Sequence, residues 1–232
     1  MLALETSTDL CSAALWRDGR VDAREVVAGR RNSELLLPLV DALFAELDMA
    51  ARDLDAIAFG AGPGAFTGLR IACGVAQGMA FGLNLPVVGI GTLLALAEAA
   101  GAPRVVCCLD ARMGEVYHAA YEARDEEWHA VHAPGLYKPL AVPQLPDGQW
   151  TGCGSGFAAY RSALETRYAG RLERVVENLT PHAREIAALA VRQFSRGNAV
   201  DAADASPLYV RNKVALPIDE RSKHTPRKCN GR

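Results

Sequence analysis

The chain has 232 residues, enough for one large or two small domains with sizeable cores, and half of its residues are hydrophobic. Its formal net charge is only −2, so the charge of the whole protein gives no reason to expect nucleic-acid binding, and any contact with a polyanion has to be local. The first residues, Met-Leu-Ala-Leu-Glu, contain no basic stretch and no apolar run ending in a cleavage site, so no export signal is expected.

The six cysteines form no C-x-x-C pair, and four of them lie in apolar segments. This pattern is typical of small core residues in a reducing compartment, so we expect a cytoplasmic protein. The five histidines are scattered and show neither the H-E-x-x-H spacing nor any other metal-ligand cluster. We therefore expect no metal.

Three consecutive antiparallel strands are predicted at the start of the chain. Turn chemistry at Thr6–Asp9 separates the first two, and the pair Asp18-Gly19 is typical of a hairpin turn between the next two. The expected strands are residues 1–5, 11–16 and 21–27.

A helix follows, with Asn32 suited to cap its start and Pro38 tolerated in its first turns. Its apolar residues recur with a period of about 3.6, as on one face of a helix. They are Leu36, Val40, Leu43, Phe44 and Leu47.

The stretch 59–70 is a glycine-rich turn that leads from a strand at 56–59 into a second helix. No Asp, Glu, Lys, Arg or His occurs from Ile71 to Ala97, so this helix has almost no face that favours water. Breaks within the uncharged run indicate helix, turn, strand at 87–90 and a helix capped by Thr92, rather than a membrane span. The interrupting residues are Asn84, Pro86, Gly89 and Gly91.

Three glycines of the uncharged helix, Gly74, Gly78 and Gly82, are spaced four residues apart and form a smooth row along one side. Each lowers helix stability by about 1 kcal/mol relative to Ala, and such a row allows another backbone to come close. Two interpretations remain open. The helix either packs tightly on its own sheet or provides a docking surface for a second subunit.

After Gly101-Ala102-Pro103 the same order of elements begins again. An apolar strand at 105–110 ends in an acid, as residues 1–5 do, and Thr180-Pro181 has the chemistry of an N-cap followed by the first helical residue. The stretch 133–148, rich in Pro and Gly, matches no element. The other expected elements are strands at 115–121, around 128–131 and near 172–176, and a helix at about 157–164.

Both halves thus predict three antiparallel strands followed by alternating helices and strands. We expect an α/β fold of two tandem ribonuclease H-like lobes with mixed sheets flanked by helices, at 1–102 and 103–216. Ligands of α/β folds gather at the carboxyl ends of strands, so Glu5 and Asp110, which close the first strand of each half, should lie near the mouth of a cleft. The basic end, 217–232, is expected to be a disordered tail, with an electrostatic arm for RNA phosphates as the alternative.

The turn Glu5-Thr6-Ser7-Thr8 combines hydroxyls and amides with a carboxylate, the groups needed to hold a phosphate and its magnesium. An ordinary polar turn is an equally good interpretation. No Lys or Arg in the turn can neutralise phosphate charge, which argues against an active phosphotransferase. At most, Glu5, Thr6, Ser7, Thr8 and Asp110 form a vestigial nucleotide or phosphate site.

A second glycine cluster, Gly152–Gly156, reads G-C-G-S-G and precedes the helix at about 157–164. It lacks the full dinucleotide spacing and the distal acid, so a plain loop is favoured. It also differs from the nucleophile elbow G-x-S-x-G, because Ser155 lies one place too late. A hydrolase is therefore not favoured.

Five segments spread over nearly the whole chain resemble the bacterial TsaB family, and the block G-P-G-A-F-T-G-L-R is highly specific. The segments are 4–8, 32–38, 62–70, 110–117 and 207–211. The resemblance implies the two-lobed ASKHA fold of actin, Hsp70 and the sugar kinases. It also implies a role in forming N6-threonylcarbamoyladenosine (t6A) at position 37 of tRNAs that read ANN codons.

In that family the protein is a non-catalytic paralogue of the transferase subunit TsaD and pairs with it, while a small ATPase, TsaE, joins the assembly. The resemblance therefore implies a heterodimer with a TsaD-type subunit, a homodimer when alone, contact with tRNA through the complex, and no membrane. ATP is used by the complex, and no cofactor is expected on this chain. The H-x-x-x-H pair with which the active paralogue holds its metal is absent from this sequence.

The partner surface of the family is a bundle of the first two helices of the N-terminal lobe, here about 33–47 and 67–83. The expected interface residues are Leu36, Val40, Leu43, Phe44, Ile71, Gly74, Val75, Gly78, Met79 and Gly82.

The sequence departs from the family pattern at two positions. Asn32 replaces the His of the usual H-S-E, and Glu5 replaces the usual Asp, which weakens the inherited case for magnesium. The alternative function is an ATP-dependent kinase that holds magnesium with Glu5 and Asp110. Older descriptions of the family call it a peptidase, but this sequence offers no catalytic residues for that activity.

Overall fold

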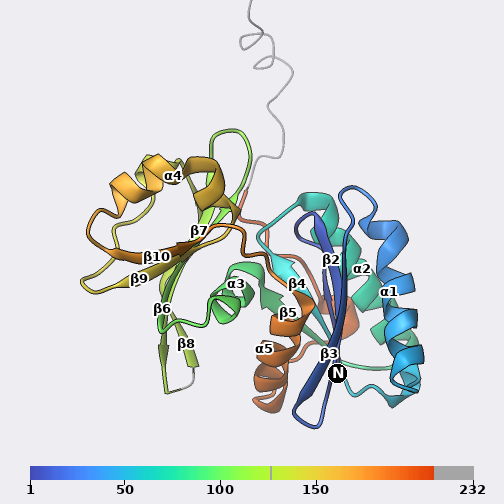
Figure 1. Cartoon of the computed structure of the whole chain (residues 1–232). Helices are drawn as coiled ribbons and strands as arrows, with labels where there is room; N and C mark the ends of the chain where they lie inside the picture. Colours follow the sequence, from blue (N-terminus) through green and yellow to red (C-terminus); the bar gives the residue numbers. More distant parts are fainter. Residues whose placement is uncertain (126, 212–232) are drawn as a thin grey trace, which may run out of the picture.

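The computed structural model describes residues 1–125 and 127–211. They form two lobes, each built on a five-stranded mixed sheet with helices against it (Figure 1). The predicted α/β fold with two such lobes is confirmed. The basic segment 217–232 lies outside the described residues.

The sheet of the first lobe has the order β3-β2-β1-β4-β5. Its first three strands are antiparallel, as the hairpin turn predicts, and β1, β4 and β5 are parallel to one another. The strands are β1 (Leu2–Glu5), β2 (Leu10–Arg17), β3 (Arg20–Val27), β4 (Ile57–Gly62) and β5 (Val87–Gly91).

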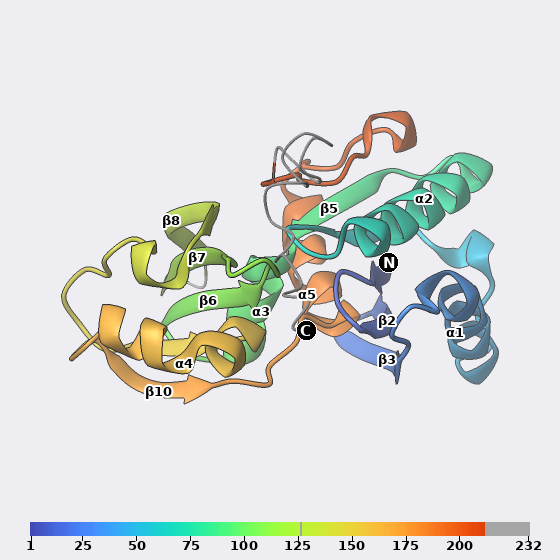
Figure 2. The ribbon, with the colours of Figure 1, turned by 90° about the horizontal axis from the view of Figure 1, so that it is seen from above.

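Helices cover both faces of this sheet, so its central strands are buried on both sides. Leu2 and Leu4 of β1 point to the face that holds α1 (Asn32–Glu46) and α2 (Phe66–Leu83). Ala3, between them, points to the other face, as the two-residue repeat of a strand requires. Figure 2 shows α1 and the C-terminal half of α2 on the side of this lobe away from the second lobe.

The second sheet repeats the first, with the order β10-β9-β6-β7-β8. Its helix α4 (Ser155–Arg167) covers one face, and α3 (Thr92–Ala100) packs between the two sheets, with Ala95 in a core of the first lobe and Leu93 and Leu96 in a core of the second. The strands are β6 (Arg104–Asp110), β7 (Val116–Arg124), β8 (Glu127–Tyr137), β9 (Trp150–Cys153) and β10 (Leu172–Val176).

The last helix, α5 (Ala183–Ser195), returns to the first lobe and does not belong to the second. Its buried residues Ile186 and Ala187 share a core with Ala3 and Ala58 of the first sheet. The short 3₁₀ helix η3 (Ala202–Asp204) then lies against α2 (Figure 2), where Gln77 Nε2 donates to the carbonyl of Ala202 over 3.1 Å. The expectation that 103–216 forms the second lobe is therefore wrong at its C-terminal end, because α5 and η3 pack on the first lobe. Helix α3 covers only part of the sheet face that carries Ala3, so α5 is needed to bury the rest.

Three helix starts differ from the sequence prediction by one or two residues. Asn32 is the first residue of α1 rather than its cap, and its Nδ2 donates to the carbonyl of Thr8 over 3.3 Å. Thr92 likewise opens α3, after Gly91. Helix α5 begins at Ala183 instead of after Thr180, because Ser12 Oγ on β2 accepts the hydrogen bond of the Ala183 amide at 2.9 Å. A capping oxygen from a distant strand leaves no local sequence signal.

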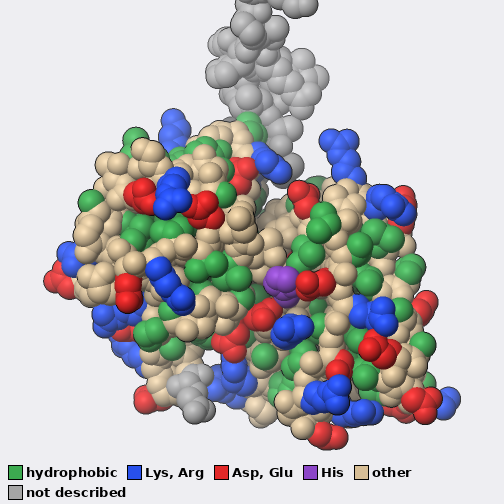
Figure 3. Space-filling model, viewed as in Figure 1, with side chains coloured by type: hydrophobic (Ala, Val, Ile, Leu, Met, Phe, Trp, Pro, Cys, Tyr) green, Lys and Arg blue, Asp and Glu red, His purple; other side chains and the backbone are tan. Residues whose placement is uncertain are grey.

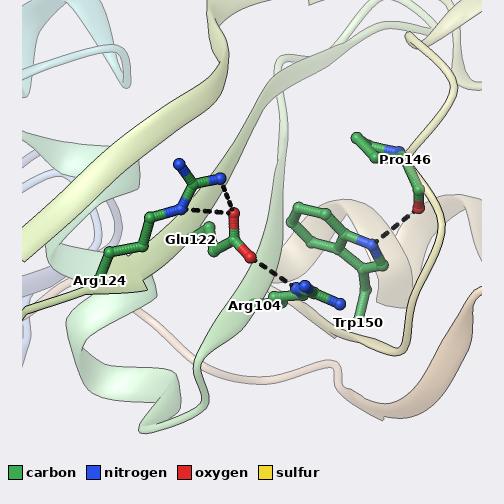
Figure 4. A network of polar contacts seen from close by, with 5 residues as sticks. All are labelled: Arg104, Glu122, Arg124, Pro146 and Trp150. Atoms are coloured by element: carbon green, nitrogen blue, oxygen red, sulfur yellow. Dashed lines mark hydrogen bonds and ion pairs between the residues drawn. The ribbon is translucent and has the colours of Figure 1, made fainter.

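The stretch 133–148 is more regular than its composition suggests. Strand β8 continues to Tyr137, and the loop after it is held by the Trp150 indole, which donates to the carbonyl of Pro146 over 3.2 Å (Figure 4). A Cβ on Gly148, whose φ is +126°, would lie 2.0 Å from Arg104 Nη1. Arg104 in turn binds Glu122 at 2.8 Å, which also accepts from Arg124 (Figure 4). Gly148 therefore serves close packing against Arg104.

Among the residues that the structure describes, none of the helices combines the length and the apolar character needed to cross a bilayer.

Candidate functional site

A cleft of about 870 Å³ lies between the two lobes, where the surface in Figure 3 is hollowed. It opens beside the carboxyl ends of β1, β4 and β6, where α/β folds gather ligands. Four segments line most of it: the turn after β1, the glycine-rich turn before α2, the hairpin after β6, and residues 208–211. Its exposed apolar side chains are Val27, Phe66, Met113, Leu208 and Tyr209.

Glu5 does not reach this cleft. Its side chain is fully buried, its Oε1 accepts a hydrogen bond from the Ser7 amide, and its Oε2 has no partner. A Cβ on Gly60 would lie only 1.9 Å from that Oε2, so the carboxyl occupies the space that the glycine leaves. Burial raises the pKa of Glu5 to about 7, against the lowering by its hydrogen bonds to Ser7. The expectation that Glu5 lies at the mouth of the cleft is wrong, because its side chain points into the sheet packing.

The turn that follows Glu5 is held by the glycine-rich segment. Thr6 Oγ1 donates to the carbonyl of Gly68 over 2.7 Å, and the Ala65 amide donates to the carbonyl of Ser7 over 2.8 Å. A Cβ on Gly68 would lie 1.9 Å from the Thr6 carbonyl oxygen, and one on Gly64 would lie 2.6 Å from Ser7 Cβ. These two glycines are needed for close contact with the β1–β2 turn, which explains their place in the G-P-G-A-F-T-G motif by packing alone.

Asp110 does line the cleft, with a side chain that is 16% exposed. Its Oδ1 accepts from the Arg112 amide at 2.8 Å and from the Tyr160 hydroxyl at 3.2 Å, and its Oδ2 accepts from Arg112 Nη1 at 3.1 Å. Ser155, from the second glycine cluster, accepts a hydrogen bond from the Asp110 amide at 3.1 Å. The carboxylate is thus neutralised within its own hairpin.

This arrangement does not fit the magnesium that a kinase would need. One carboxyl of the expected pair is buried, with a raised pKa and no access to the cleft, and the other is bound by Arg112. Within residues 1–125 and 127–211, no cluster of three or more His, Cys, Asp or Glu side chains is arranged to hold a metal. Of the residues expected to form a phosphate site, Ser7, Thr8 and Asp110 line the cleft.

Helix α2 presents its glycine row to the outside. Gly74, Gly78 and Gly82 are exposed, and a Cβ at any of them would have no atom beyond the helix within 4 Å. The opposite side packs on the sheet through three fully buried alanines with the same spacing: Ala72, Ala76 and Ala80. The helix therefore does pack on its own sheet, as the first of the two interpretations has it, but the glycine row takes no part in that packing. The alanine row serves that packing, and its spacing is visible in the sequence.

The remaining expected interface residues divide into two groups. Ile71, Val75 and Met79 flank the glycine row and are partly buried. The four expected on α1 form part of the first core, with exposed fractions of 1% for Leu36, Val40 and Leu43 and 9% for Phe44, so they cannot present a contact surface in this conformation. The apolar stripe of an amphipathic helix faces its own core. The large apolar side chains exposed on the two helices are Leu37 at 47% on α1, and Phe66 at 37% and Phe81 at 81% on α2.

The two lobes of matching strand order, joined around a cleft, define an α/β protein of the ASKHA fold. Two solved structures from Pseudomonas aeruginosa share it, one described as an uncharacterized protein with similarity to peptidase YeaZ and one as YeaZ. Each superposes with a TM-score of 0.84 at 40% sequence identity, and the match covers 90% of this chain and 98% of the solved chain.

The family model TsaD, described as tRNA N6-adenosine threonylcarbamoyltransferase, matches residues 26–216. Proteins named tRNA threonylcarbamoyladenosine biosynthesis protein TsaB are 39% identical in Escherichia coli (93% of this chain, 96% of the relative) and 34% identical in Haemophilus influenzae (92% and 94%). The chain belongs to the TsaB family.

Proposed function

We propose that this chain is the non-catalytic scaffold subunit of the complex that forms t6A at position 37 of tRNAs reading ANN codons. In this role it binds a TsaD-type transferase subunit and supports it. The names of its relatives give the pathway, and the exposed glycine row of α2 is the single observation that carries the scaffold role.

A non-catalytic role is supported by the cleft. Glu5 is buried under Gly60, and Asp110 is bound by Arg112. Both acids are therefore engaged by groups of their own lobes, Glu5 in the core and Asp110 at the edge of the cleft. Under this proposal ATP is used elsewhere in the assembly, which includes a TsaE-type ATPase, and tRNA is reached through the complex.

The outer side of α2 is suited to a partner helix. Side chains at Gly74, Gly78 and Gly82 are absent, so two backbones can approach closely, and Val75, Met79 and Phe81 offer apolar contacts beside the row. A standard interface buries about 800 Å² per partner, although area does not convert directly into affinity. The same surface would pair two copies of this chain when the partner is missing.

The test is a Gly78→Arg variant, co-expressed with its TsaD-type partner. Arg at this position should abolish co-purification, because a long charged side chain would stand between the two helices. The variant itself should fold, since nothing lies within 4 Å of the added Cβ. Leu140→Arg, at a 63% exposed position of the second lobe, is the matched control and should still co-purify. Co-purification of Gly78→Arg at the wild-type level would refute the scaffold surface.

A further inference from the structure

Residues Leu208–Arg211, which we call the strap, contact both lobes along the edge of the cleft. All four line it. The chain passes between the lobes at 101–103 and at 177–182. The strap adds a third connection, whose attachment to the second lobe is non-covalent.

The strap is anchored on the first lobe by its backbone and by an aromatic side chain. The Leu208 amide donates to the carbonyl of Ala61, at the end of β4, over 2.7 Å. The Tyr209 hydroxyl accepts from Arg70 Nε at 3.0 Å, and its ring lies 5.6 Å from that of Phe66. Arg70 also stacks 3.9 Å above the Phe66 ring, so the first turn of α2 and the strap form one cluster.

On the second lobe the strap is held by Arg211. Its Nη2 donates to the carbonyl of Ala111 over 3.0 Å and pairs with Glu115 Oε2 at 2.9 Å. The side chains of Arg211 and Glu115 are only 15% and 28% exposed, so solvent screens this ion pair less than the other pairs on the surface. A charge-assisted hydrogen bond of this kind is among the stronger polar contacts in proteins.

The β6–β7 hairpin, to which Arg211 binds, has an unfavourable backbone conformation in its turn. Arg112 and Met113 have φ values of +61° and +56°, in the left-handed region that costs a residue with a side chain about 1 to 2 kcal/mol. Such a conformation persists when surrounding contacts hold it. Arg211 binds Ala111, directly before this pair, and Glu115, two residues after it, so it holds the hairpin turn at both ends.

The geometry points to a latch: the strap fixes the distance between the two lobes at the cleft, and release of Arg211 from the β6–β7 hairpin lets the lobes separate. Two-lobed proteins commonly open and close around a cleft by hinge motion. In this chain the strap spans the cleft, and its attachment to the second lobe consists of the mostly buried Arg211–Glu115 ion pair, the hydrogen bond from Arg211 to the Ala111 carbonyl and a contact of Arg211 Nη1 with Met113 Sδ at 3.4 Å. The molecule is thereby held in a single lobe arrangement.

The test measures the distance between the lobes by pulsed electron paramagnetic resonance. Spin labels are attached to Asp41→Cys on α1 and Leu140→Cys in the second lobe, both exposed positions. The five described cysteines are buried, and Cys229 is replaced by Ser. Excess unlabelled chain suppresses distances between copies. The latch predicts one narrow distance distribution for the otherwise unchanged chain, and a broader distribution at longer distance for Arg211→Ala.

Hydrogen exchange provides a second readout, because the hairpin amides should exchange about tenfold faster in Arg211→Ala once a charged hydrogen bond is lost. Arg112→Ala is the matched control for distance, since it removes an exposed arginine of the same hairpin whose ion pair stays within the second lobe. Glu115→Gln weakens the latch from the other side and decides the question if Arg211→Ala does not fold. An unchanged distance distribution in the folded variants would overturn the latch.

Discussion

At the residue scale, the main departure from expectation is the environment of Glu5. A strand-end acid in a two-lobed fold is expected to face the cleft, yet this carboxyl lies beneath Gly60 with one oxygen unpartnered. The extra methylene of Glu relative to Asp lengthens the reach of the side chain, and a glycine on the neighbouring strand provides the room. The Glu5 carboxyl therefore affects stability rather than chemistry.

This environment predicts how stability depends on pH. The pKa of Glu5 is about 7 in the folded chain, above its value of 4.5 when unfolded, so the folded state binds the proton more tightly. Its contribution is fully present below pH 4.5 and is lost as the pH rises through 7. Glu5→Gln, which cannot ionise, should therefore gain stability over the wild type between pH 5 and pH 8, by at most about 3 kcal/mol. Urea unfolding at the two pH values measures this gain, and a pH-independent difference would contradict it.

At the scale of the element, α2 combines two rows of small residues with opposite roles. The alanine row allows the helix to pack on the sheet, while the glycine row faces outward with open space above it. Glycine lowers helix stability because the unfolded chain has more conformations to lose. The glycines therefore make the isolated subunit less stable, which is consistent with a surface kept smooth for a partner.

A pair of substitutions separates the two kinds of glycine around α2. Gly78→Ala should raise the free energy of unfolding of the isolated chain by up to about 1 kcal/mol, since the new Cβ meets nothing within 4 Å. Gly68→Ala, in the first turn of the same helix, should lower it, because its Cβ would lie 1.9 Å from the Thr6 carbonyl oxygen. Thermal or urea unfolding of both variants gives the comparison. A loss of stability in Gly78→Ala would mean that the row is covered within the monomer.

At the scale of the whole molecule, the lobes are not sequential units. Helix α5 completes the core of the first lobe after the chain has passed through the second, and the strap returns to the cleft. Arg192 of α5 and the indole of Trp128 on β8 both donate to the carboxylate of Glu98 on α3, so three elements from both halves meet at one acid. The two lobes should therefore unfold together.

This organisation predicts that residues 1–102 alone do not form a stable domain. Without α5, the sheet face that carries Ala3 and Ala58 is exposed to water, and an uncovered apolar face favours loosely packed or aggregated states. The fragment should show poor proton NMR dispersion and bind a hydrophobic dye. Addition of residues 183–211 through a flexible linker should restore cooperative unfolding. Cooperative unfolding of the 1–102 fragment by itself would contradict this organisation.

Much of the fold was predictable because hydrophobic repeats and turn residues act locally. The hairpin at Asp18-Gly19 and the strand 172–176 lie where the sequence predicts them. Strand β9 was missed because Trp150–Cys153 is short and runs into a glycine cluster, and the start of α5 because its cap comes from Ser12. The strap was visible only as a motif of the family, since nothing in the order of its residues indicates which segments it joins.

The sequence by itself determined the duplicated strand order, the uncharged helix with its row of glycines, and the family, because these depend on the order and type of neighbouring residues. The tertiary structure alone decided that the glycine row faces outward, that Glu5 turns away from the cleft, that α5 completes the first lobe and that Arg211 reaches across to Glu115. Each of these depends on which surfaces pack together over long separations in the chain, and burial and charge pairing at such distances leave no local pattern.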